Sequence, residues 1–188
     1  MSGRLVFIRW HRLIKNACSL FGLFPKFVMD FVWLLLSSSN GKIALFVRYA
    51  YLKKYAKFIG NNVYIGSNCI LKNIDKLSIG DNVSIHNFCY IDAVGEIDIG
   101  SHVSIAHNCS FVSFDHGFDD ELKPIKYNSI KYGPIAIFED VWIGCGARIL
   151  CGTTIYSRSI IAAGAVVRGI VPERSIFGGV PARLIKKI

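Results

Sequence analysis

Large apolar residues recur at every sixth position over most of the chain beyond residue 58. A six-residue period is too long for one turn of a helix and too regular for ordinary strands, but it suits a solenoid whose coils have three short flat faces. The pattern therefore predicts an all-β solenoid, a parallel β-helix, for residues 59–188. The residues of this series are Ile59, Ile65, Leu71, Ile79, Ile85, Ile91, Ile99, Ile105, Phe111, Ile137, Ile143, Ile149, Ile155, Ile161 and Val167.

The phase of this series predicts the length of a coil. The series slips by two residues between Leu71 and Ile79, and again between Ile91 and Ile99. The early coils therefore have a 20-residue repeat, in which Ile79 and Ile99 hold equivalent positions. Residues that are one coil apart are expected to stack at the strand spacing of about 4.8 Å.

Three of the six cysteines follow the same register. Cys69, Cys89 and Cys109 occupy equivalent small, inward positions of successive coils, which predicts an interior ladder of free thiols. Cysteine pairs of the C-x-x-C type, which a zinc site would favour, are absent from the sequence. Neither a disulfide nor a metal site is expected, and this cysteine usage is typical of a reducing compartment.

The segment 1–58 differs in composition from the rest of the chain. It contains ten lysines and arginines against one acidic residue, Asp30, whereas the remainder of the chain holds 12 basic and 12 acidic side chains. This segment is also rich in Phe, Trp and Leu, and helices of that composition suit the surface of an anionic membrane. Pro25, Lys26 and Asp30 interrupt its longest apolar stretch, which argues against a transmembrane helix. No cleavage site for a secretory signal is seen.

Two interpretations of residues 1–58 stay open at this point. Helices from this segment could cap the open end of the solenoid, since solenoids need such caps. They could also contact an anionic membrane surface in addition to capping. Nucleic acid is a poor candidate partner, because the chain carries no motif for base or phosphate recognition.

The repeat is interrupted between Phe111 and Ile137, which predicts a protruding loop over about residues 112–136. An insertion of this size in a uniform solenoid is typical of a functional loop. His116 stands at the root of the loop. An imidazole, whose ordinary pKa is about 6.5, can accept a proton from a hydroxyl at neutral pH, so His116 is a candidate general base, although a lone surface histidine is the commoner case.

Three segments carry a resemblance to a known family. They are Ser113-Phe114-Asp115-His116-Gly117, Asp140-Val141-Trp142-Ile143-Gly144 and Gly178-Gly179-Val180-Pro181-Ala182-Arg183. Together with the six-residue repeat, they resemble the hexapeptide-repeat acyltransferases of left-handed β-helix fold. Within that superfamily, residues 59–188 look most like bacterial O-acetyltransferases that act on sugars, including galactoside and maltose acetyltransferases and enzymes of capsule, O-antigen and colanic acid synthesis.

The resemblance implies a homotrimer that uses acetyl-CoA directly, with three active sites between neighbouring protomers. His116 matches the family's catalytic histidine, which would take the proton of the acceptor hydroxyl. The coenzyme would lie along the C-terminal coils. The positions that match its binding residues are Gly144, Cys145, Ala163, Gly164, Arg168, Arg183 and Lys186. Relatives often carry Thr-Lys where this chain has Arg168-Gly169.

The acceptor side of the site matches less well. Asn87 and Asp92 fall where sugar acetyltransferases have an Asn-rich segment ending in an acid, and Trp142 matches an aromatic beside the site. Ile85 and Ala93 replace residues that are polar in the galactoside and maltose enzymes, which disfavours a small free sugar as acceptor. A sugar or a lipid-linked glycan at the cytoplasmic face of the inner membrane is the acceptor expected for a peripheral, cytoplasmic enzyme.

The register of the early coils suggests a partner for the histidine. Glu96 follows Ile91 by five residues, as His116 follows Phe111, so Glu96 is expected to stack near His116 and to orient its imidazole. Asp115 and Asp119 are the alternatives.

Two other functions compete with acetyl transfer. His102 and His107 have a five-residue spacing that the γ-class carbonic anhydrases also use for zinc ligands, but only His86 or His116 remains as a third ligand, and neither has the matching spacing. The other possibility is a trimeric scaffold subunit without catalysis. The loop histidine and the ending with Arg183 argue against a scaffold, because a scaffold needs neither.

Overall fold

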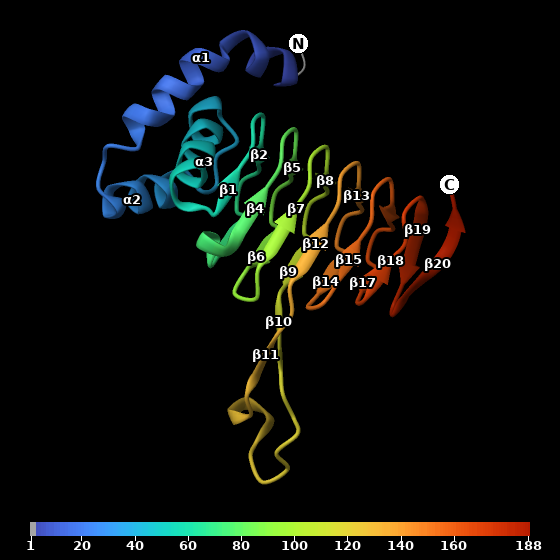
Figure 1. The fold of residues 1–188 in the computed structure, drawn as a ribbon. Coiled ribbons are helices and arrows are strands. Elements are labelled where there is room, and N and C mark those ends of the chain that lie inside the picture. The colour runs from blue at the N-terminus through green and yellow to red at the C-terminus, as the bar shows by residue number, and fades with distance from the viewer. Residues whose placement is uncertain (1–2) are drawn as a thin grey trace.

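A computed structural model describes residues 3–188, so that Met1 and Ser2 of the predicted N-terminal segment lie outside the described residues. The chain begins with three helices and continues as a prism of short parallel strands (Figure 1). A two-stranded loop projects from the side of the prism, and the C-terminus lies at the end of the prism opposite the helices.

Three parallel sheets form the faces of the prism. Sheet A contains β1 (Phe58–Ile59), β4 (Leu77–Ile79), β7 (Ile97–Ile99), β12 (Ile135–Ile137), β15 (Thr154–Ile155) and β18 (Ile170–Val171). Sheet B contains β2 (Tyr64–Ile65), β5 (Ser84–Ile85), β8 (Ser104–Ile105), β13 (Trp142–Ile143), β16 (Ile160–Ile161), β19 (Ser175–Gly179) and the antiparallel final strand β20 (Ala182–Lys187). Sheet C contains β3 (Ile70–Lys72), β6 (Tyr90–Asp92), β9 (Ser110–Val112), β14 (Arg148–Leu150) and β17 (Val166–Val167).

The strand register confirms the predicted β-helix. Ile59 pairs with Ile79, and Ile85 pairs with Ile105, as the predicted repeat of the early coils requires. After the loop the coils are shorter: Ile143 pairs with Ile161, 18 residues on, and Ile161 pairs with Phe177, 16 residues on. The residues of the six-residue series are buried, with Leu71 partly buried, because each points into the prism and stacks on its equivalent in the next coil. The fold is thus the predicted left-handed β-helix.

The coils turn at three edges, which we name after the sheets they join: the A/B, B/C and C/A edges. At many of these turns one residue has the left-handed backbone conformation. Asparagine tolerates this conformation better than most side chains, and glycine adopts it freely. Early coils use Asn62, Asn68, Asn82 and Asn108 there, and later coils use Gly146, Gly152, Gly164 and Gly169.

The predicted cysteine ladder is present inside the prism. Cys69, Cys89 and Cys109 are buried and free. Each thiol donates a hydrogen bond to a backbone carbonyl of the following coil, at Sγ to O distances of 3.2, 3.3 and 3.2 Å. The ladder therefore satisfies its weak polar groups while it fills the core.

The three helices are α1 (Gly3–Phe21), α2 (Lys26–Leu36) and α3 (Lys42–Tyr55). Helix α3 buries Tyr49 and Leu52 against the first coil, and Met29 of α2 is fully buried. The helices thus cover the N-terminal end of the solenoid (Figure 1). Among the residues that the structure describes, no helix has the length and apolar character needed to cross a bilayer.

Arg48 on α3 connects the helices to the solenoid. Its side chain is 2% exposed, and its guanidinium donates to the carbonyl oxygens of Leu36, Ser39 and Ile65, at 3.0, 2.8 and 2.9 Å. Burial lowers the pKa of this arginine below its ordinary value. Arg48 is one of the ten basic residues of the N-terminal segment, but its position makes it a structural cross-link rather than a surface charge.

The loop leaves the prism at the C/A edge. After β9 the chain forms β10 (Phe114–His116), the short 3-10 helix η2 (Ile125–Tyr127) and β11 (Ile130–Tyr132), which pairs antiparallel with β10. The coil resumes where the Gly133 N–H donates to the Ser113 carbonyl at 3.0 Å. A second 3-10 helix, η1 (Ile74–Lys76), lies on the same edge in the first coil.

Candidate functional site

His116 lies at the root of the loop, where the paired strands hold it close to the prism. It is the last residue of β10 and stands opposite Ile130 of β11. Its side chain is exposed, and its ring meets the ring of Phe114 edge to face at a centroid distance of 6.4 Å. Within residues 3–188, no side chain or backbone group hydrogen bonds to this imidazole. Both ring nitrogens are therefore available to a substrate.

Asp115, one of the predicted supports of His116, is engaged elsewhere. Its carboxylate forms an ion pair with Arg168, which lies after β17 on the same C/A edge. The Cys151 thiol also contacts this carboxylate, at an Sγ to Oδ2 distance of 3.5 Å. The Arg168 guanidinium lowers the pKa of the Asp115 carboxyl below its ordinary value. The pair joins the loop to two C-terminal coils, and it uses the charge of Arg168, which the family resemblance assigned to the coenzyme.

The prediction that Glu96 stacks beneath His116 is wrong. The chain leaves the coil before it reaches the position above Glu96, and the N–H of Ile135, beyond the loop, donates to the Glu96 carbonyl at 3.1 Å. The Glu96 carboxylate instead lies 3.4 Å from the Lys57 amine. Asp119, the other alternative, pairs with Lys131 at 2.6 Å. All three candidate carboxylates thus have partners other than His116.

The contact between Asp115 and Cys151 makes the reactivity of this thiol testable. Burial and the Asp115 carboxylate raise the pKa of Cys151 above its ordinary value. Asp115→Asn removes that negative charge and leaves Arg168 beside the thiol. We expect alkylation of Cys151 by iodoacetamide at neutral pH to accelerate roughly threefold to tenfold, because a full unit in pKa changes the thiolate fraction tenfold.

Peptide mass spectrometry measures this rate separately for each cysteine. Cys145 is also partly exposed but lies on the B/C edge, so it serves as an internal control whose rate stays constant. Equal acceleration at both cysteines, or at neither, contradicts the interpretation. The ion pair itself is present above the ordinary carboxyl pKa of about 3.9 and is lost as the pH falls through the lowered value of Asp115.

Four of the predicted coenzyme residues meet on the B/C edge. The Gly164 N–H donates to the Cys145 carbonyl at 2.8 Å, and the register places Ala163 over Cys145, beside Gly144, and Gly164 over Gly146. A Cβ on Gly144 would lie 2.6 Å from the Ala163 nitrogen, so coil packing alone requires this glycine. Gly164 differs, since a Cβ there would meet no atom within 4 Å. The backbone at Gly164 is therefore open to a molecule lying along the edge.

Arg183 and Lys186 belong to the last strand, β20. Arg183 pairs with Gly178, and the preceding strand positions Gly178 beside Ala162, so Arg183 reaches the B/C edge near Ala163. Lys186 pairs with Ile176, which continues a row across sheet B through Ile160 to Trp142. Both basic side chains are exposed. Arg183 is thus close to the open strip at Gly164, whereas Lys186 shares a face with Trp142.

The predicted acceptor residues are largely occupied by contacts within the fold. Asp92 is only 6% exposed, and its carboxylate accepts from Asn73 Nδ2 at 2.7 Å and from the Tyr90 hydroxyl at 3.2 Å. The Asn87 side-chain oxygen accepts from the Ser67 N–H at 3.1 Å. Trp142, by contrast, is 54% exposed on sheet B. Trp142 is therefore the one of the three whose side chain faces outward without a described hydrogen bond.

A single chain does not bring these groups together. His116 and Asp115 lie at the C/A edge, the Gly164 strip lies at the B/C edge, and Trp142 stands on sheet B, the face opposite the C/A edge. The prism is rigid, so its three edges stay apart.

The histidines proposed as metal ligands are also dispersed. His102 and His107 flank β8 on opposite edges of the prism, and His86 follows β5. His102 has the left-handed backbone of an A/B turn. The residues of the chain that the structure describes include no group of three His, Cys, Asp or Glu side chains able to hold a metal ion.

Comparison with known proteins gives a consistent picture. No model of a known protein family matches the chain. The chain is 42% identical over 78 residues to a probable acetyltransferase of Mycobacterium tuberculosis, covering 42% of this chain and 26% of the relative. It is 36% identical over 64 residues to the putative lipopolysaccharide biosynthesis O-acetyl transferase WbbJ of Escherichia coli, covering 34% and 33%. The chain thus spans about a third or less of the length of these curated relatives.

A solved structure matches far more of the chain. The hexapeptide-repeat acetyltransferase of Vibrio cholerae, in complex with acetyl-CoA, superimposes with a TM-score of 0.74 at 28% identity and covers 85% of this chain and 84% of its own. The relatives named as acetyltransferases, the repeat and the β-helix all agree. The chain is therefore similar in sequence to proteins named as acetyltransferases and in fold to the hexapeptide-repeat acetyltransferases.

Proposed function

We propose that this protein is an acetyl-CoA-dependent O-acetyltransferase that modifies a sugar hydroxyl in the synthesis of a bacterial surface polysaccharide. The observation that carries the proposal is the exposed imidazole of His116 at the rigid root of the loop, with both ring nitrogens available to a substrate. The similarity to WbbJ, which is named for lipopolysaccharide O-acetylation, supports the class of acceptor.

In the proposed reaction His116 acts as general base. It takes the proton of the acceptor hydroxyl while the hydroxyl oxygen attacks the thioester carbonyl of acetyl-CoA. The C–S bond of the resulting tetrahedral intermediate then breaks, and the CoA thiolate leaves with a proton from the imidazolium. The open backbone at Gly164 and the exposed charge of Arg183 would hold the pantetheine arm and a phosphate of the coenzyme.

The proposed active enzyme is a homotrimer with three sites between protomers. Its support is the separation of the candidate residues over different edges of one prism. A threefold axis parallel to the prism would set the loop of one protomer, with His116, against the B/C edge and Trp142 of its neighbour. One chain alone would then be inactive, whatever its affinity for acetyl-CoA.

We further propose that the enzyme works in the cytoplasm, peripherally on the inner membrane, where polysaccharide units are assembled on lipid carriers. Support comes from exposed apolar side chains on the N-terminal helices. On α2 they recur with helical spacing, and Leu34 is 68% exposed. The large exposed apolar residues of α1, α2 and the turn between them are Trp10, Leu13, Leu20, Leu23, Phe24, Phe27, Phe31, Leu34 and Leu35. Such a surface beside basic residues suits an anionic leaflet.

A direct assay tests the proposed activity. The full chain is incubated with acetyl-CoA and a panel of acceptors (nucleotide sugars, lipid-linked oligosaccharides, polymer and amino sugars), and free CoA thiol is measured. We expect release that depends on a hydroxyl acceptor, from a species of about three times 20.9 kDa by light scattering. Release that requires an amine would change the proposal to N-acylation. Absence of CoA binding would overturn it and favour a trimeric scaffold.

A further inference from the structure

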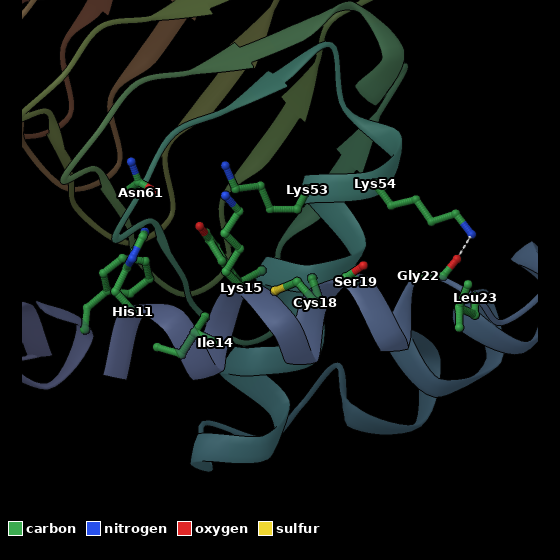
Figure 2. A pocket seen from close by; sticks show the side chains of 13 residues that line it. His11, Ile14, Lys15, Cys18, Ser19, Gly22, Leu23, Lys53, Lys54 and Asn61 are labelled. Carbon is green, nitrogen blue, oxygen red and sulfur yellow. Dashed lines mark hydrogen bonds between the residues drawn. The ribbon is translucent and has the colours of Figure 1, made fainter. Parts of the chain in front are cut away.

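A hollow lies between α1, α3 and the first coil, far from the loop that carries His116. Its volume is about 610 Å³, and it opens to solvent between the N-terminal helix and the end of the prism (Figure 2). Helix α1 contributes His11, Lys15 and Cys18, α3 contributes Lys53, and Asn61 of the first coil closes the far side. The proposed transferase activity uses none of these residues.

Cationic groups converge in this hollow. Figure 2 shows the amines of Lys15 and Lys53 pointing toward the same region, with His11 and Asn61 beside them. The Lys53 amine also donates to the Ile59 carbonyl, whereas Lys15 makes no hydrogen bond or ion pair with the described residues. The described lining contains no carboxylate. The hollow therefore has a net positive charge and free N–H donors.

The electrostatics of Lys53 are those of a site that lacks its counter-ion. Partial burial lowers the pKa of Lys53, and the positive charge of Lys15 lowers it further. Cys18 and Asp81 raise the pKa of Lys53, but burial raises the pKa of the Cys18 thiol itself, and the Asp81 Oδ1 already accepts the Asn61 N–H at 2.5 Å. Two ammonium groups placed together repel each other, and an anion between them would convert this repulsion into two charge-assisted hydrogen bonds.

The surroundings of the hollow indicate which anion. Leu23, at its rim, is 80% exposed, and Trp10 and Leu13 are exposed on α1 outside the lining of the hollow. Phe27, Phe31 and Leu34 continue the apolar surface along α2. A free anion gains no favourable contact from this apolar surface. An anion that carries acyl chains would contact both the cationic hollow and the apolar surface.

We propose that this hollow binds the phosphate group of an anionic membrane lipid, with Lys15 and Lys53 as its two cationic contacts. This inference deepens the membrane part of the proposed function and rests on it. The phosphate enters from the rim at Leu23, and the lipid chains lie beside the exposed residues of α1 and α2. The site anchors the enzyme in one orientation, because the hollow lies at one end of the prism.

The test uses the full chain and vesicles of phosphatidylcholine with or without phosphatidylglycerol, with binding measured by flotation. We expect Lys15→Gln to weaken binding to the anionic vesicles roughly tenfold or more, since it removes a charge-assisted contact. Lys15→Arg should restore most of the affinity. Lys53→Gln should behave like Lys15→Gln, with thermal melting to confirm folding, because Lys53 also bonds to the backbone.

Lys42→Gln is the matched control. Lys42 is exposed at the start of α3, about 16 Å along the helix from Lys53, and its loss changes the net charge equally. We expect a decrease below about fivefold, the contribution of one surface charge. If Lys42→Gln weakens binding as much as Lys15→Gln, the site inference is overturned while membrane binding stands. If the wild-type chain binds vesicles with and without phosphatidylglycerol equally weakly, both the inference and the membrane proposal are overturned.

A second arm distinguishes the source of the phosphate. Glycerol phosphate and inorganic phosphate are titrated into the full chain by calorimetry in the absence of lipid. The inference expects both to bind far more weakly than the vesicles, because they lack the apolar part. Binding of either soluble anion that is as tight as vesicle binding, and lost in Lys15→Gln, would make the hollow a free-anion site and overturn the lipid assignment.

Discussion

Replacing His116 by alanine is expected to lower kcat for acetyl transfer by about 10²–10⁴-fold, the usual contribution of a positioned general base. His116 is exposed on β10, and the β10 and β11 pairing holds its backbone. Because no described residue depends on its imidazole for a hydrogen bond, the substitution removes the base without disturbing the fold. Acetyl-CoA binding should persist, since the candidate coenzyme residues at Gly164 and Arg183 lie on a different edge of the prism.

Steady-state kinetics with the active acceptor, together with calorimetric binding of CoA, measure this effect. His116→Gln should be nearly as inactive as the alanine variant, because an amide can hydrogen bond but cannot take up the proton. His86→Ala is the matched control, since His86 is also an exposed histidine and packs on the ring of Tyr64. We expect its rate to equal that of the wild type. A His116 variant with unchanged kcat would exclude the imidazole as the base.

Arg48→Met is expected to destabilise the protein by about 3 kcal/mol or more, because each buried polar group left without a partner costs about 1–3 kcal/mol. The guanidinium satisfies three backbone carbonyls, of Leu36, Ser39 and Ile65, and these acceptors stay in place when their donor is removed. Methionine has a similar length but no donor, so the variant isolates the loss of hydrogen bonds from the loss of volume.

Urea unfolding followed by circular dichroism measures this free energy. Arg48→Lys should also be destabilised, because a single ammonium cannot reproduce the three directions of the guanidinium fork. Lys42→Met on the same helix is the control, since Lys42 is exposed, and its midpoint should match the wild type. An Arg48→Met midpoint equal to that of the wild type would mean that solvent reaches the three carbonyls after substitution.

Much of the solenoid follows directly from the sequence. A residue such as Ile85 pairs with Ile105 because each coil repeats the same inward positions, so the spacing of apolar residues is enough to predict the pairing. The cysteine ladder follows from the same rule. The protruding loop is visible as an interruption of the repeat, and His116 is visible as the candidate base by its place in the loop.

The contacts of charged residues were not predictable in the same way. The stacking rule paired Glu96 with His116, but the chain leaves the coil at Phe114, and the strand that returns above Glu96 begins at Ile135. The Asp115 to Arg168 pair joins residues 53 positions apart through the loop, whose path has no repeat. From the sequence, Arg48 is expected to be an ordinary surface charge, because no local pattern distinguishes it from the other basic residues of α3.

The sequence by itself determined the β-helix, its register, its interior and the place of the loop histidine, because in a solenoid each coil contacts only its neighbours and a fixed period specifies those contacts. Only the tertiary structure decided which partners the charged side chains take, that Arg48 is buried, and that Lys15 and Lys53 share one hollow. Those outcomes depend on where the non-repeating segments pack against the prism. An ion pair or hydrogen bond forms only when two side chains lie within a few ångströms of each other, and the spacing of residues in the sequence does not predict that distance for segments without a repeat.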